Sequence, residues 1–144
     1  MSIWLDTRNA IVTAVTAIPT IPAVKKRNRA EFRDKDPVQI VTISWADAKY
    51  FDPGLVYENN VSIVYGFDIT IFDQENFLND GDPTSLIGWN KSILQALYVL
   101  LPGVAGLYNY EVIPGVLAEP IGSQNGYFRS SIRVQFTVNE LGNG

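Results

Sequence analysis

The chain has 144 residues, of which 47% are hydrophobic and 18% charged, and its formal net charge is −4. It contains no cysteine and no histidine, which excludes disulfides, thiolate chemistry, a histidine general base and the usual zinc ligands. This length and composition predict a single globular domain over residues 1–144, with a frayed tail at 140–144. The sequence shows neither an apolar run long enough to span a membrane nor the pattern of a secretory signal, so we expect no membrane partner.

The first predicted element is a helix over residues 3–17. Trp4, Ile11, Val15 and Ile18 recur in it at helical spacing, which predicts one buried stripe. The prolines of "IPTIP" end this helix, since proline cannot continue the hydrogen-bond ladder.

The next stretch, "VKKRNRAEFRDKDP", is strongly basic. Residues 25–35 have a charge of +6 − 2 = +4, and the rest of the chain has +5 − 13 = −8. Six of the eleven cations of the chain lie here: Lys25, Lys26, Arg27, Arg29, Arg33 and Lys35. We weigh three interpretations: a nucleic-acid-binding arm, a solvated loop, and an interface arm that docks on the acidic body of an identical neighbour.

Two strands follow. Residues 37–45 are β-branched and apolar on both faces, and residues 61–72 alternate strictly, with Phe67, Ile69 and Ile71 among those predicted to face the core. Asp68 falls on the opposite face of that strand.

The connection between these two strands, residues 46–60, is long and aromatic. It contains Tyr50, Phe51 and Tyr57, and Trp45 immediately precedes it. Two alternatives stay open: a protein–protein contact, or aromatic rings that fold back onto the end of the sheet. We include Tyr50, Phe51 and Tyr57 with the six cations as interface candidates.

The second half of the chain predicts one helix and two strands. Either Asp82 or Thr84 is expected to cap the start of the helix, which ends at "LPG". A strand over 108–117 is broken at Pro114, which indicates a bulge or an edge position, and a regular strand covers 127–140. The order of elements predicts an α+β domain: a mostly antiparallel β-sheet with two α-helices packed on one face.

Nothing in the sequence predicts an enzyme, a cofactor or a metal site. The acidic loop at 73–82 fails the calcium-loop pattern, because alignment on Gly81 puts Leu78 at a ligand position and Ile87 where a bidentate glutamate belongs. No phosphate-binding glycine loop is present, and the serines lack a nearby base. We therefore expect no catalytic residue, no bound cofactor and no metal.

The order and pattern of these elements resemble the tail-terminator and tail-completion proteins of tailed phages. The resemblance is carried by "IPAVKKRN", "RDKDPVQIVTIS", "NVSIVYGFDITIFDQEN", "LIGWNKSILQALYVLLPGVAGLYNYEVIPG" and "FRSSIRVQFTVNE". It implies a structural virion protein that forms a ring, six-membered as in the tail tube, at the head–tail junction. The ring would cap the tail tube, contact the head connector and let DNA pass without sequence-specific binding.

Two alternatives to this reading remain. The first is another neck component, a stopper or an adaptor, because such subunits share the same pattern. The second is a small nucleic-acid-binding module that uses the basic stretch at 25–35. The acidic remainder of the chain argues against the second, since it would repel a long duplex.

Overall fold

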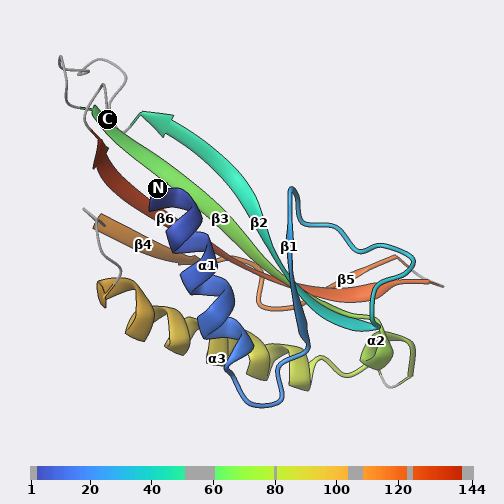
Figure 1. The fold of residues 1–144 in the computed structure, drawn as a ribbon. Helices are drawn as coiled ribbons and strands as arrows, with labels where there is room; N and C mark the ends of the chain where they lie inside the picture. The colour runs from blue at the N-terminus through green and yellow to red at the C-terminus, as the bar shows by residue number, and fades with distance from the viewer. Residues whose placement is uncertain (1–2, 51–60, 80, 104–108, 123–124, 141–144) are drawn as a thin grey trace.

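The structure is a computed structural model that describes residues 3–50, 61–79, 81–103, 109–122 and 125–140 (Figure 1). It confirms the predicted α+β class, with one mostly antiparallel sheet and two long helices on one of its faces. The elements in chain order are α1 (Ile3–Thr16), β1 (Ala23–Arg27), β2 (Gln39–Tyr50), β3 (Val61–Asp73), α2 (Glu75–Asn79), α3 (Thr84–Leu100), the 3-10 turn η1 (Leu101–Gly103), β4 (Asn109–Pro114), β5 (Glu119–Ile121) and β6 (Tyr127–Glu140).

The strands form one sheet in the order β1-β2-β3-β6-β4, with β5 also paired to β6. All pairs are antiparallel except β1 and β2, which run parallel. The long strands β3 and β6 form the centre of the sheet. Among the described strands, β1 therefore lies at one edge, and β4 and β5 lie at the other.

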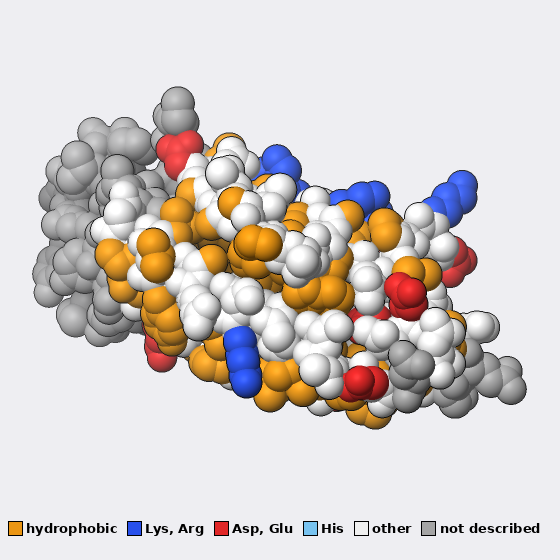
Figure 2. All heavy atoms as spheres, turned by 90° about the horizontal axis from the view of Figure 1, so that it is seen from below, with side chains coloured by type: hydrophobic (Ala, Val, Ile, Leu, Met, Phe, Trp, Pro, Cys, Tyr) orange, Lys and Arg blue, Asp and Glu red, His pale blue; other side chains and the backbone are white. Residues whose placement is uncertain are grey.

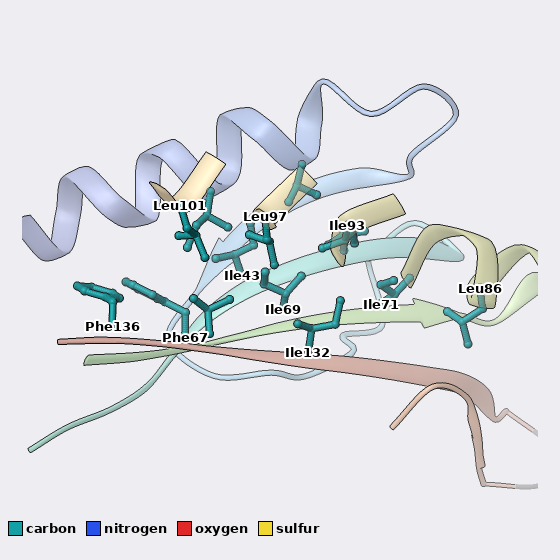
Figure 3. Packing of buried hydrophobic residues seen from close by; sticks show 14 of the residues in the cluster. Ile43, Phe67, Ile69, Ile71, Leu86, Ile93, Leu97, Leu101, Ile132 and Phe136 are labelled. Carbon is teal, nitrogen blue, oxygen red and sulfur yellow. The ribbon is translucent and has the colours of Figure 1, made fainter. Parts of the chain in front are cut away.

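The core lies between the sheet and the two long helices. The alternation predicted for β3 is confirmed, because Phe67, Ile69 and Ile71 are at most 1% exposed and face the helices (Figure 3). From α3, Ile93 and Leu97 pack down onto these strand residues and are fully buried (Figure 3). Burial of each such side chain contributes roughly 1.5–3 kcal/mol, so this layer is the main source of stability.

The prediction that Asp82 or Thr84 is the N-cap of α3 is wrong, because neither residue holds that position and no side chain makes a capping hydrogen bond from it. The N-cap position is Pro83, and Asp82 accepts hydrogen bonds from the backbone N–H (3.0 Å) and the hydroxyl (2.6 Å) of Thr84. These bonds lower the pKa of Asp82. Asp82 rather than Thr84 therefore supplies the acceptor.

Besides the turn η1, three elements were not predicted: strands β1 and β5 and the short helix α2. Strand β1 overlaps the start of the basic stretch, β5 lies between the two strands predicted in the second half, and α2 lies within the predicted acidic loop. The carboxylate of Asp73 begins α2 by accepting a hydrogen bond from the backbone N–H of Asn76 (3.1 Å). Strand β2 also continues to Tyr50, past an irregularity between Trp45 and Asp47. The predicted connection at 46–60 therefore begins later than expected.

The predicted break at Pro114 is confirmed at the sheet edge. Strand β4 ends there, and the Gly115 N–H then donates to the Ser131 carbonyl (3.0 Å) while the Ser131 N–H donates to the Val116 carbonyl (2.8 Å). A Cβ at Gly115 would lie 2.6 Å from the Ser131 Oγ. The close approach of the two backbones therefore requires glycine.

Candidate functional site

The basic stretch is a strap across the sheet face that the helices leave open. We define the strap as residues 28–36, between β1 and β2. The ring of Phe32 lies 5.7 Å from that of Phe72 and 5.3 Å from that of Tyr127, measured between centroids. Phe72 and Tyr127 alternate with core-facing neighbours in β3 and β6, so they point away from the helices. The strap is thus anchored on the second face by an aromatic contact.

An ion pair joins the last residue of β1, Arg27, to the last residue of the strap, Asp36. Both terminal nitrogens of Arg27 donate to the carboxylate of Asp36, and Nη1 also donates to the carbonyl of Glu31 (3.0 Å). The side chains of Arg27 and Asp36 are only 6% and 4% exposed. The hydrogen bond from Arg27 lowers the pKa of Asp36 to about 2 against the opposing effect of burial, and the same bond raises the pKa of Arg27. The charge of Arg27 is therefore used inside the chain.

A second, more exposed cluster occupies the middle of the strap. Glu31 accepts hydrogen bonds from Arg33 Nε (2.6 Å) and Arg29 Nε (3.1 Å), and the bond from Arg33 is the main cause of its lowered pKa. Three of the six predicted interface cations, Arg27, Arg29 and Arg33, thus have an acidic partner in their own chain. The charge count over residues 25–35 left out Asp36, which is the next residue, so sequence reasoning did not identify it as the partner of Arg27.

The other three cations lie at the surface without an ion pair to any described carboxylate. Lys25 and Lys26 are exposed on β1, at the edge of the sheet, and Lys35 is exposed on the strap. Because the backbone of an edge strand has one unpaired side, β1 offers both hydrogen-bonding groups and positive charge to a neighbour.

The opposite edge of the sheet carries negative charge and apolar surface. Glu111 is exposed on β4 and forms no ion pair within the described residues. Val116 and Leu117 follow it and are 37% and 46% exposed. Glu119 on β5, by contrast, pairs with Arg129. The two edges therefore differ in charge and are suited to contact each other in separate copies.

Two of the three predicted aromatic candidates lie outside the residues that the structure describes. Tyr50 is the last residue of β2, and Phe51 and Tyr57 lie outside the described residues. The neighbouring Trp45 is packed inward, with its ring 4.4 Å from Trp4 and 5.7 Å from Phe67 between centroids. Trp45 thus packs back onto the sheet, as the second alternative predicted.

A shallow apolar groove of about 530 Å³ runs between α1 and α3 on the outer side of the helix layer. Val99, which lines the groove, is 83% exposed, and its neighbour Tyr98 is 55% exposed. Figure 2 views the molecule from below and shows many exposed hydrophobic side chains there and few charged ones. The groove is lined by Ala14, Ile18, Pro19, Ser92, Gln95, Ala96, Val99 and Leu100. Such a surface is suited to contact with another protein.

The second sheet face also holds the predicted surface carboxylate Asp68. It lies opposite Arg133 in the register of β3 and β6 and accepts a hydrogen bond from its Nε (2.9 Å). This bond raises the pKa of Arg133. The placement of Asp68 away from the core is confirmed, and its role here is a cross-strand pair.

Within the described ranges, no three histidine, cysteine, aspartate or glutamate residues come together as a metal site would require. Asp73, one of the acids of the predicted acidic loop, is buried and caps α2 instead. No helix among the described residues is both long and apolar enough to cross a membrane. The chain matches no protein-family model and is not detectably similar in sequence to any curated protein. Function must therefore be argued from geometry.

Proposed function

We propose that this protein is a structural, non-enzymatic virion component of a tailed phage that assembles head to tail into a ring at the head–tail junction. The observation that carries the proposal is the pair of unlike edges of one sheet: Lys25 and Lys26 on β1, and Glu111 on β4. An edge-to-edge contact between copies would bring these charges together and continue the hydrogen bonding of the sheet.

A contact between two different surfaces of the same chain repeats from copy to copy. It gives a ring when the rotation between neighbours closes and a filament when it does not. The resemblance to tail-terminator proteins favours the closed ring, with six subunits. In that assembly, each copy presents its β1 edge to the β4 edge of the next copy.

The helix layer supplies a separate surface for the other neck partners. The α1–α3 groove and the exposed Val99 lie on the helix side of the sheet rather than at either edge. A ring closed through the sheet edges therefore leaves this apolar surface available for the tail tube or the connector. A stopper or adaptor role would use the same surfaces at another level of the neck.

The nucleic-acid-binding alternative is less well supported. Arg27, Arg29 and Arg33 are neutralised by Asp36 and Glu31, so the basic stretch offers few cations to phosphates. We therefore propose that DNA passes through the ring without being held by it, in keeping with a conduit.

Negative-stain electron microscopy and native mass spectrometry of the purified protein test this proposal together. We expect ring-shaped particles with a central hole and a mass that is a whole multiple of 16.0 kDa, six-fold in the first instance. A protein that stays monomeric at all accessible concentrations, both alone and with tail tubes, would contradict the proposal.

A further inference from the structure

A pocket of about 420 Å³ lies where the first half of α1 meets the sheet. Its lining combines aromatic rings with two arginines, and the residues are Trp4, Arg8, Arg27, Asn28, Trp45 and Tyr65. Lys25, Lys26 and Glu111, on which the proposed ring contact depends, are not among these lining residues. The inference below therefore does not rest on the proposed function.

Arg8 is the unusual member of this group. The chain has six arginines, and Arg8 is the only one that forms no ion pair with a carboxylate among the described residues. Its guanidinium instead lies over the ring of Trp4, with Cζ 4.9 Å from the ring centroid. Stacking on an aromatic face leaves the edge of a guanidinium free to bind an anion.

Two hydrogen-bond donors next to the pocket have no acceptor. Nε of Arg8 and Nε1 of Trp4 are both buried and form no hydrogen bond with a described residue. A buried donor without an acceptor costs roughly 1–3 kcal/mol, so native structures seldom keep one without a reason. Since no described carboxylate forms an ion pair with Arg8, rotation about its side-chain torsions can bring Nε to an oxygen atom seated in the pocket.

The charge of the pocket favours a singly charged ligand. Arg27 is already neutralised by Asp36, so among the described lining residues Arg8 contributes the one uncompensated charge. Trp45 and Tyr65 form an aromatic wall, with ring centroids 5.9 Å apart. The site thus combines a single cation, two unused N–H donors and an apolar wall.

We propose that this pocket binds a carboxylate carried on an aromatic or other apolar group. The carboxylate pairs with the Arg8 guanidinium and accepts the unused N–H groups, while the apolar group packs against Trp45 and Tyr65. The carboxylate belongs either to a free small acid or to an acidic side chain flanked by apolar residues in a partner protein.

The indole N–H resonances give a direct test in ¹⁵N–¹H spectra of the intact protein. The chain has three tryptophans, Trp4, Trp45 and Trp89, so single substitutions to phenylalanine assign all three signals. On titration with phenylacetate we expect the Trp4 signal to move downfield as its N–H gains an acceptor, and the Trp89 signal, from outside the pocket, to stay in place. An acetylated and amidated Phe-Glu-Phe peptide forms the second arm, and the tighter binder of the two identifies the source of the carboxylate.

Two probes and three variants control the test. Benzyl alcohol lacks the charge and inorganic phosphate lacks the apolar group; a Trp4 shift with either one as large as with phenylacetate would overturn the proposal. Arg8→Gln should weaken phenylacetate binding by about tenfold or more. Arg29→Gln, whose parent side chain is 81% exposed, should leave binding unchanged.

Trp4→Phe keeps an aromatic ring but removes the N–H donor, so it should weaken binding, read from the Trp45 signal, without unfolding the chain. Absence of any Trp4 shift with both carboxylate probes, in protein whose spectrum shows a folded chain, would also overturn the proposal.

Discussion

The guanidinium of Arg27 and the carboxylate of Asp36 form a buried, two-pronged ion pair that joins the end of β1 to the end of the strap. The backbone N–H of Arg33 adds a further hydrogen bond to Asp36 (2.8 Å). This pair holds the nine strap residues in place, although they contain no helix or strand. The cations and acids of this basic segment therefore serve in part to fix the strap to the sheet.

Acid should weaken this ion pair within a defined pH range. Because the folded-state pKa of Asp36 is lowered to about 2, its stabilisation is present above the ordinary aspartate pKa and is lost as the pH falls from about 4 to about 2. Over that range we expect wild type to lose about 2 kcal/mol of unfolding free energy through this group. Asp36→Asn should cost about 3 kcal/mol at pH 7 and much less at pH 2, measured by urea unfolding.

Asp68→Asn is the matched control for that measurement. The Asp68–Arg133 pair is also an aspartate–arginine contact, but its side chains are 29% and 41% exposed. Its loss should cost at most about 1 kcal/mol at pH 7. Equal losses in the two variants would contradict a special role for the buried pair.

Phe32→Ala should release the strap from the sheet. The half-buried ring loses its contacts with Phe72 and Tyr127, and we expect a loss of about 2 kcal/mol. Hydrogen exchange should speed up at the Arg33 and Asp36 amides and stay slow in the central strands. Phe32→Leu keeps most of the volume and should cost less than about 1.5 kcal/mol. Unchanged exchange in Phe32→Ala would mean that the ring does not anchor the strap.

Charge reversal at the β1 edge should disrupt the rings. Lys25→Glu with Lys26→Glu places like charges opposite Glu111 of the neighbouring copy, so the oligomer should dissociate, as measured by native mass spectrometry. Adding Glu111→Lys should restore it in part. Arg27 is left unchanged, because its buried pair with Asp36 stabilises the folded chain.

Reversal of Lys35 and Lys91 to Glu gives the same change in net charge, but on the strap and on α3 rather than on β1. Rings should survive in this control variant. If both double variants lose the ring equally, net charge rather than the edge contact governs assembly.

Duplex DNA should bind weakly. Each phosphate contact contributes about −0.9 to the slope of log K against log salt, and the six cations of the basic stretch would together give about −5. With three of them neutralised internally, we expect no micromolar affinity near 0.15 M salt and a slope much shallower than that, by fluorescence anisotropy. Tight binding with a steep slope would favour the nucleic-acid module.

The elements predicted well from sequence are those whose pattern is long. Strands β3 and β6 alternate over more than ten residues, and α1 and α3 repeat their apolar stripe over several turns, so local pattern and tertiary burial agree. Strand β1 was missed because it is short, lies at an edge and contains only two apolar residues, Ala23 and Val24. Helix α2 has five residues, and only the spacing of Asp73 and Asn76 signals its start.

The candidate sites were predicted less well, for a physical reason. Composition shows how many charges a segment has, but the pairing of Arg27 with Asp36 depends on how an irregular strap turns back on itself. The same holds for the pocket at Arg8, which brings together α1 and strands that follow far later in the chain. Neither Arg8 nor Glu111 lies in a sequence motif that could have identified it.

The strap also sets an order on folding. Its anchor Phe32 is among the first quarter of the chain to be synthesised, but it packs against Tyr127, which is among the last residues to emerge. Contacts this distant in sequence form slowly, because a long loop of chain must close first. Phe32 can meet Phe72 once β3 is in place, but its contact with Tyr127 must wait until β6 joins the sheet. The anchor of the strap is thus completed late, although Phe32 itself is made early.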